Sequence, residues 1–206
     1  MLGSTKLSAE NHDNSTAGAY QLFTGTAVRL FHEFEAPYID VRGDGVFALF
    51  NSNQPYRALA AAVSFKTFAR EVFVPLVREK TQVEVGCHIG IDQKTVLVRK
   101  LGLKHHDERT DRQNEVWAGK PINMASKLAA RSQDDELFAS DRFFEKIQND
   151  LVLLSCGCPE GEKSSLWEEV DVSDIGLFDF DSAWVLRSCW CSTHGKEYCE
   201  SILALD

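Results

Sequence analysis

Residues 37–51 constrain the fold of this chain more than any other stretch. The sequence PYIDVRGDGVFALFN has two apolar-rich runs around Gly-Asp-Gly, and glycines on both sides of a turn aspartate are typical of a tight β-hairpin. The hairpin lies between two long segments, 17–35 and 54–80, in which apolar residues recur every three or four positions, as in amphipathic helices. Short strands mixed with long helices, without strict alternation, predict an α+β fold.

The rest of the chain contains shorter elements. The sequence predicts strands at 83–91, 95–101 and 137–139, a helix that begins near Lys120 with Pro121 in its first turn, and a helix capped by Ser140 or Asp141. The charged stretch 104–114 is expected to be an exposed loop. After about Leu151 we expect short strands and loops that share one core with the rest of the chain.

The composition excludes several classes of function. The 206 residues include 22 Lys and Arg against 31 Asp and Glu, which gives a formal charge of −9. Nucleic-acid and anionic-membrane binders need a basic surface, so neither partner is expected. No apolar run is long enough for a transmembrane helix or a secretory signal, so we expect a soluble, cytoplasmic protein. Its six cysteines should then be thiols or metal ligands rather than disulfides.

Two motifs carry groups suited to phosphate chemistry. Asp44 lies between Gly43 and Gly45 at the hairpin tip, where a hydrated ion or a phosphate can approach the backbone. Asn123 and Lys127 are four residues apart, on one helix face, and can jointly hold a sugar oxygen and a phosphate. Taken singly each motif is a weak signal, because Asp-Gly is a common hairpin turn and polar helix faces are usually just solvated.

In order and spacing, the motifs resemble the catalytic domain of class III nucleotidyl cyclases over residues 1 to about 150. The matching blocks are 1–8 after the family's first strand, 40–45 in its metal-binding hairpin, 85–90 in its G-I-H-x-G strand, and 119–127 in its G-x-x-V-N-x-A-x-R motif. The resemblance implies a ferredoxin-like, palm-type α+β domain with a mixed, mainly antiparallel sheet and helices packed on it. It divides the chain into a catalytic core, 1–150, and a Cys-rich extension, 151–206, packed on the same domain.

The resemblance also implies how metal and triphosphate would be held. Asp44 and the backbone carbonyl of Met1 would bind two Mg²⁺ or Mn²⁺ ions per site, which activate the attacking oxygen and neutralise the phosphates. The backbone N–H groups of Gly3, Ser4 and Thr5 would wrap the triphosphate. The family's first metal aspartate immediately precedes the position of Met1, so we expect the printed sequence to begin one residue after it.

The implied reaction is cyclisation of a nucleoside triphosphate, in which the ribose 3′-oxygen attacks the α-phosphorus and pyrophosphate leaves. Asn123 would orient the ribose, and Lys127 would stabilise charge on the α-phosphoryl oxygens. Lys127 replaces the family's usual arginine, which keeps the charge but not the planar, two-pronged geometry. Because the family builds each site from two protomers, a head-to-tail homodimer is implied.

The base-reading positions depart from the familiar purine cyclases. They correspond to Asp40 and Val116, which match neither the adenylyl nor the guanylyl pattern; Val116 cannot form hydrogen bonds, and an ionised Asp40 cannot donate one. Tyr38 and Arg42 share the strand face of Asp40 by alternation. We expect these four residues to contact the base.

The altered pocket and the Cys-rich tail resemble the pyrimidine cyclases of Pycsar antiphage defence. The resemblance implies that UTP, or alternatively CTP, is converted into a 3′,5′-cyclic second messenger. That messenger would activate a separate effector protein. UTP is favoured over CTP, although no residue distinguishes the two. The main alternative is a catalytically inactive, cyclase-like domain that binds nucleotide and regulates. A diguanylate cyclase is less favoured, because Val46 occupies the position of that family's second acidic residue.

Five of the six cysteines lie in the last quarter of the chain, with His194 among them. Cys156, Cys158, Cys191 and Cys199 could supply soft ligands, together with His194, to a structural Zn²⁺ ion. However, Cys-x-Cys is not the usual Cys-x-x-Cys spacing, and small buried cysteines are common in protein cores. The sequence alone therefore favours core cysteines over a zinc site.

Overall fold

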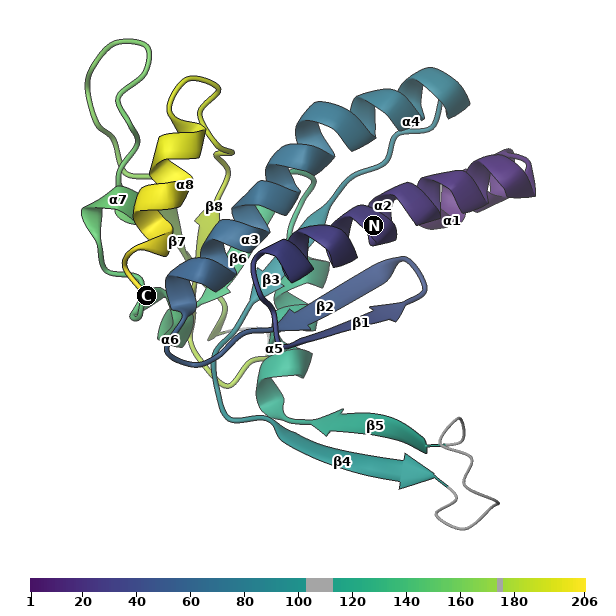
Figure 1. Cartoon of the computed structure of the whole chain (residues 1–206), viewed down its shortest axis with the longest axis horizontal. Coiled ribbons are helices and arrows are strands. Elements are labelled where there is room, and N and C mark those ends of the chain that lie inside the picture. Colours follow the sequence, from purple (N-terminus) through teal and green to yellow (C-terminus); the bar gives the residue numbers. More distant parts are fainter. Residues whose placement is uncertain (103–112, 174–175) are drawn as a thin grey trace.

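The computed structural model describes residues 1–102, 113–173 and 176–206, and within these only the backbone for 100–102 and 113–118. The described elements follow in this order (Figure 1): α1 (Ser4–Glu10), α2 (Asp13–Glu33), β1 (Tyr38–Arg42), β2 (Gly45–Leu49), α3 (Pro55–Phe68), η1 (Ala69–Phe73), α4 (Val74–Thr81), β3 (His88–Ile91), β4 (Leu97–Gly102), β5 (Gln113–Ala118), α5 (Lys120–Arg131), β6 (Glu136–Ser140), α6 (Asp141–Phe144), α7 (Asp150–Leu153), β7 (Trp167–Asp171), β8 (Ser182–Leu186) and α8 (Gly195–Leu203).

A four-stranded sheet in the order β3-β6-β8-β7 forms the centre of the molecule. β3 and β6 run parallel, whereas β8 is antiparallel to both β6 and β7. Two further antiparallel pairs, β1–β2 and β4–β5, form ladders of their own. This mixed, mainly antiparallel arrangement with packed helices confirms the predicted α+β class.

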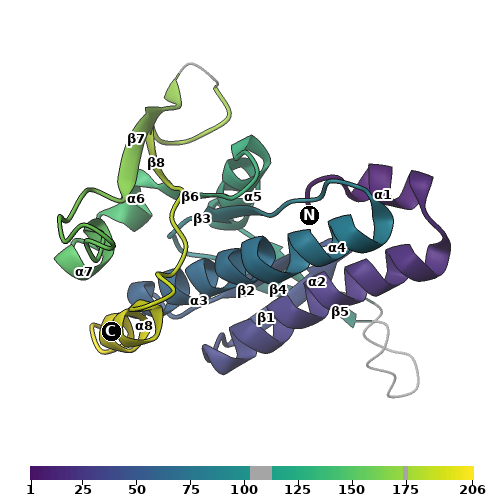
Figure 2. The ribbon, with the colours of Figure 1, turned by 90° about the horizontal axis from the view of Figure 1, so that it is seen from above.

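Helices cover both faces of the central sheet. Figure 2 shows α5 on one side of β3 and β6 and α3 on the other, and both helices contact the sheet. α2 packs against α3 and against the β1–β2 hairpin. The C-terminal α8 also packs on α3, so strands and helices beyond residue 150 share a core with the preceding ones. The division into core and extension at residue 150 stays a prediction.

The contact between α5 and β3 depends on Gly90. A Cβ at this position would lie 2.0 Å from the carbonyl oxygen of Ala125 and 2.6 Å from the backbone nitrogen of Ala129. Any side chain would therefore push the helix off the strand. The glycine lets the α5 backbone rest directly on the sheet, and this fixes the position of the helix that carries Asn123 and Lys127.

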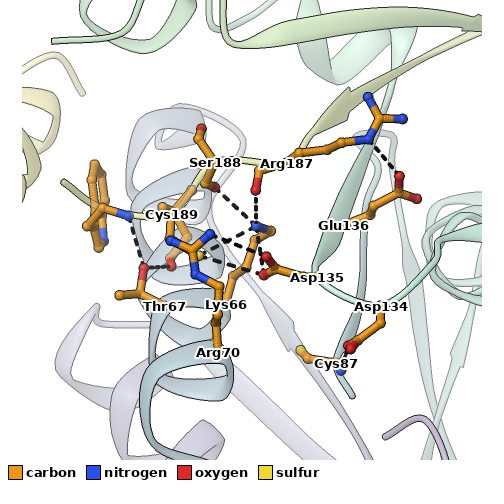
Figure 3. Close-up of polar contacts among 12 residues, drawn as sticks. Lys66, Thr67, Arg70, Cys87, Asp134, Asp135, Glu136, Arg187, Ser188 and Cys189 are labelled. Carbon is orange, nitrogen blue, oxygen red and sulfur yellow. Dashed lines mark hydrogen bonds and ion pairs between the residues drawn. The ribbon is translucent and has the colours of Figure 1, made fainter. Parts of the chain in front are cut away.

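A buried lysine ties α3 to the strands (Figure 3). The Lys66 side chain is 1% exposed, and its ammonium donates to the carbonyl oxygens of Arg187 at 2.7 Å and Ser188 at 3.2 Å. It also lies 3.0 Å from Asp135 Oδ1. Because a buried ammonium is costly unless it is paired and hydrogen-bonded, these contacts hold α3, the turn before β6 and the segment after β8 in one arrangement.

Several predicted elements are confirmed with small shifts in their bounds. The hairpin, the helix from 17 to 35 and the helix that starts at Lys120 correspond to β1–β2, α2 and α5. Ser140 caps α6, and its hydroxyl accepts the backbone N–H of Phe143 at 3.3 Å. Most of the predicted loop 104–114 lies outside the described residues, and β5 begins at Gln113.

Other predictions were wrong. The segment 54–80 is not one regular α-helix, because Ala69–Phe73 forms a wider π-type turn just before Pro75, which has no N–H to donate to the preceding turn. Only His88–Ile91 of the predicted strand 83–91 joins the sheet, apart from one isolated bridge at Gly86. The expectation of only strands and loops after Leu151 missed α8, and β5 was missed as a strand.

Among the described residues, no helix is both long and apolar enough to cross a bilayer.

Candidate active site

A carboxylate and the start of a helix meet at the tip of the β1–β2 hairpin. Gly43 has φ of 63°, a positive value that suits a two-residue hairpin turn and that glycine adopts without strain. The side chain of Ser4 hydrogen-bonds to the carboxylate of Asp44, the next residue in the turn. The Met1 nitrogen lies 3.5 Å from Asp44 Oδ2 and donates to the Asp44 carbonyl at 3.3 Å. Three predicted site residues, Met1, Ser4 and Asp44, are thus brought together.

The surroundings of Asp44 keep its carboxyl group charged. The side chain is 34% exposed, and this partial burial acts to raise its pKa. The hydrogen bond from the Ser4 side chain acts against burial, and the pKa of Asp44 lies below its ordinary value of 3.8. An ionised carboxylate next to other oxygen groups is the donor set that hard divalent cations such as Mg²⁺ prefer.

Gly3 shapes the backbone just before α1. Leu2 pairs with Gly86 through two backbone hydrogen bonds, and Gly3 then turns the chain into α1 with φ of 75°. A Cβ on Gly3 would lie 2.5 Å from the carbonyl oxygen of Glu84, so only glycine fits. The first N–H groups of a helix have no partner within it, so those of Ser4 and Thr5 are available at the turn beside Asp44.

One face of β1 carries three more of the predicted residues. Arg42 Nε donates to Asp40 Oδ2 at 2.9 Å, and its guanidinium lies 5.7 Å from the ring centroid of Phe47. The Tyr38 ring lies 6.0 Å from the same ring. Asp40 and Phe47 are directly paired in the β1–β2 register. The face thus offers an acceptor, a donor and aromatic surface side by side, whereas Val116 lies in β5 and its side chain is outside the description.

Asn123 and Lys127 lie together on α5, away from the hairpin. Asn123 is exposed, and the Lys127 ammonium donates to the carbonyl oxygen of Leu177 at 2.7 Å. Within the described residues, neither side chain forms a hydrogen bond or an ion pair with Asp44. The structure thus describes no bond between the two predicted groups, the Asp44 group on the hairpin and the amide–ammonium pair on α5, and their roles stay predictions.

Comparison with known proteins identifies the family. No family model matches the chain. It is 37% identical over 208 aligned positions to a uridylate cyclase of Propioniciclava tarda, covering 99% of this chain and 66% of that protein. It is 33% identical to a uridylate cyclase of Micromonospora echinofusca, covering 98% of this chain and 67% of that protein. The chain belongs to the uridylate cyclase family.

The fold of this family member is that of class III cyclases. The crystal structure of the adenylyl cyclase CyaB from P. aeruginosa superposes with a TM-score of 0.67, covering 89% of this chain and 88% of that one at 15% identity. At that identity the likeness concerns the fold alone. The chain spans about two thirds of the length of the curated uridylate cyclases it matches.

The sequence did not reveal a cluster of cations beside α5. Lys94, Lys120 and Arg142 surround one carboxylate, that of Asp179, at 3.1, 3.3 and 3.0 Å. Arg142 also pairs with the buried carboxylate of Asp92. The loop between β7 and β8 is therefore anchored next to the start of α5. No local motif signals this cluster, because its members come from four separate segments of the chain.

Proposed function

We propose that this chain is the catalytic domain of a nucleotidyl cyclase that converts UTP into 3′,5′-cyclic UMP and pyrophosphate. The observation that carries the proposal is the contact of Asp44 with Ser4 and Met1, in a member of the uridylate cyclase family. This contact supports a site in which the ionised Asp44 carboxylate and the free N–H groups at the start of α1 would face the same bound triphosphate.

Two divalent ions, Mn²⁺ or Mg²⁺, are part of this proposal. The Asp44 carboxylate and the Met1 backbone carbonyl would hold them, and both are the hard oxygen ligands that these ions prefer. When bound, such ions supply activation of the attacking oxygen and neutralisation of phosphate charge. The N–H groups of Gly3, Ser4 and Thr5 would hold the terminal phosphates, since peptide N–H groups at a helix start favour anions.

We assign the pyrimidine base to the face of β1 that carries Tyr38, Asp40 and Arg42. The Asp40 carboxylate would accept a hydrogen bond from uracil N3–H, and Arg42 would donate to a ring carbonyl. Tyr38 would lie against the ring, and a base contact by Val116 stays a sequence-based prediction. The same groups also fit cytosine through its amino group, so CTP is the second candidate substrate; the names of the two relatives favour UTP.

The α5 half-site would carry out the transfer. Asn123 would orient the ribose so that its 3′-oxygen is in line with the α-phosphorus. Lys127 would leave the Leu177 carbonyl and offset charge on the α-phosphoryl oxygens. The new bond joins the 3′-oxygen to the α-phosphorus, the bond to the pyrophosphate oxygen breaks, and the hydroxyl proton is lost to solvent.

A homodimer would bring the two half-sites together. No hydrogen bond or ion pair joins Asn123 to Asp44 among the described residues, and in the proposed dimer each complete site combines α5 of one protomer with the hairpin of its partner. The β4–β5 hairpin projects from the body of the molecule, as Figure 1 shows, and carries Leu97 and Val98 at 63% and 45% exposure. Exposed apolar side chains on a projecting arm are suited to a protein contact.

We further propose that the product acts as a second messenger in bacterial antiphage defence and reaches its effector only by diffusion through the cytoplasm. A rise of cyclic UMP in phage-infected cells that express this protein would support this role. Infected cells that resist phage equally well with an Asp44→Asn variant would contradict it.

The activity is tested by turnover of the four nucleoside triphosphates with Mn²⁺, using the protein with its native N-terminus and mass-spectrometric identification of products. We expect cyclic UMP from UTP. Because a metal-bound charge is worth several kcal/mol, Asp44→Asn should lower turnover by about 100-fold or more. Asp13→Asn, which alters an exposed carboxylate at the start of α2, is the matched control.

Each outcome separates the alternatives. Cyclic CMP as the main product would replace UTP by CTP. Nucleotide binding without turnover would favour the inactive, regulatory domain. Full activity of Asp44→Asn would overturn the site assignment.

A further inference from the structure

Four metal-ligand side chains from two distant segments converge near the C-terminus. Cys156 and Cys158 follow α7, whereas Cys191 and His194 precede α8, and their ligand atoms all lie within 4.8 Å of one another. We propose that these four side chains hold a structural zinc ion. The site is separate from the nucleotide site and does not rest on the proposed function.

The distances fit a tetrahedral Cys₃His site. Cys158 Sγ lies 3.3 Å and Cys191 Sγ 3.9 Å from His194 Nδ1. Zn–S bonds of about 2.3 Å and Zn–N bonds of about 2.0 Å place tetrahedral ligand atoms about 3.5 to 3.8 Å apart. The four atoms therefore need only small side-chain adjustments to surround one ion.

Gly157 explains how the short Cys-x-Cys spacing can work. It has φ of 86°, and a Cβ on it would lie 2.9 Å from the carbonyl group of Gly161. Only glycine allows this tight turn, which brings Cys156 and Cys158 to the same place. A backbone hydrogen bond from Ser155 to Ser164 at 2.8 Å closes the base of the loop. The backbone conformation at Gly157 thus compensates for the short Cys-x-Cys spacing. The spacing alone does not reveal this conformation.

The second pair of ligands is supported by backbone donors. The N–H groups of Thr193 and His194 hydrogen-bond to Cys191 Sγ, and Gly195 N–H donates to the Cys191 carbonyl at 2.7 Å. His194 immediately precedes the nine-residue helix α8, whose N-terminus favours negative charge. A Zn²⁺ ion held by three thiolates has one net negative charge, so this position suits the complex.

Zinc at this position would fasten the C-terminal segment to the core. The two ligand loops form part of the wall of a cavity of about 470 Å³, whose lining also includes apolar side chains such as Leu59, Val63 and Ile202. No disulfide joins the loops, since all six cysteines are free. A bound zinc ion would cross-link the two loops and so stabilise this part of the fold, as structural zinc does in other small domains.

The proposal is tested by metal analysis of the full chain purified without chelators. We expect one zinc per chain in the wild type and loss of that zinc in Cys158→Ser and Cys191→Ser. Cys199→Ser is the matched control, because Cys199 lies nearby in α8 but outside the four-residue cluster, and it should keep its zinc. Asp44→Asn should also keep it, which separates this site from the nucleotide site.

If the cysteine variants fail to fold, cobalt substitution of the wild type decides the question. Co²⁺ in a tetrahedral thiolate site gives an intense visible absorption with sulfur-to-metal charge transfer. Wild-type protein that purifies without stoichiometric zinc and shows no such absorption with Co²⁺ would overturn the proposal. Retention of zinc by well-folded Cys191→Ser would do so as well.

Discussion

Asp44 and Asp179 are two carboxylates whose pKa values lie below the ordinary range for different reasons. At Asp44, burial is opposed by the hydrogen bond from the Ser4 side chain. At Asp179, burial is outweighed by hydrogen bonds from Lys94 and Lys120 and by the charge of Arg142, which lower the pKa to about 2. The first carboxylate belongs to the proposed metal site, whereas the second is already paired with Lys94, Lys120 and Arg142 and anchors a loop.

Asp179 predicts a pH dependence of stability. A pKa that is lower in the folded state contributes stability that is present above the unfolded value, near 3.8, and is lost as the pH falls toward about 2. We expect wild-type protein to be more stable than Asp179→Asn at pH 6, and this difference to shrink between pH 4 and 2. Urea unfolding at several pH values measures it.

Asp181→Asn is the control for that experiment, because it removes an exposed carboxylate from the same loop without touching the three cations. A difference between wild type and Asp179→Asn that stays constant down to pH 2 would contradict the assigned role of the ion pairs.

At the scale of elements, the packing of α5 on β3 sets the position of Asn123 and Lys127, the two residues of the proposed transfer half-site. The helix backbone rests on Gly90, and the same helix carries Asn123 and Lys127. The polar face of α5 is therefore held by a contact on its opposite, buried side. Small changes in that contact would move both side chains together.

Gly90→Ala should displace α5. An added Cβ would meet the Ala125 carbonyl at 2.0 Å, and overpacking of this kind costs about 1–3 kcal/mol. We expect lower stability in urea unfolding and a clear loss of cyclase turnover, with triphosphate binding affected less. The loss of turnover follows because a misplacement of about 1 Å can cost 100-fold in rate.

Gly18→Ala is the matched control for this substitution. Gly18 lies within α2 with nothing within 4 Å of an added Cβ, so alanine should leave activity unchanged and stabilise the helix by about 0.5–1 kcal/mol. Normal turnover in Gly90→Ala would show that α5 need not rest on the strand.

At the scale of the whole molecule, the two half-sites predict complementation between inactive variants. Asp44→Ala and Asn123→Ala should each be inactive as homodimers. In a heterodimer of the two variant chains, one site contains both substitutions and the other site contains neither. Random mixing makes half of the dimers mixed, so about a quarter of wild-type activity should return.

The measurement is turnover after co-expression of the two variants, compared with each variant alone. Mixing Asp44→Ala with itself in differently tagged copies controls for effects of co-expression. No recovery in the mixed sample would mean that Asp44 and Asn123 act within one protomer, against the proposed interface sites.

Much of the fold and part of the candidate site could be predicted from local sequence. The hairpin with Asp44 at its tip and the helix with Asn123 and Lys127 follow from turn chemistry and helical spacing, which act over a few residues. Their proposed roles depended on resemblance to a family, and the family was confirmed by relatives at 33% and 37% identity. The α8 helix was not predicted, although Tyr198, Cys199 and Ile202 recur at helical intervals.

The sequence by itself determined the class of fold, the turn at Asp44 and the helix face of Asn123, since each depends on neighbours along the chain. Only the tertiary structure decided that Ser4 and Met1 meet Asp44, that three cations share Asp179, and that four thiol and imidazole ligands converge at the C-terminus. These contacts join segments far apart in the chain, and their formation depends on how helices pack on the sheet. Spacing along a sequence suggests candidates for such approaches but does not fix them, because it is the packed core that sets them.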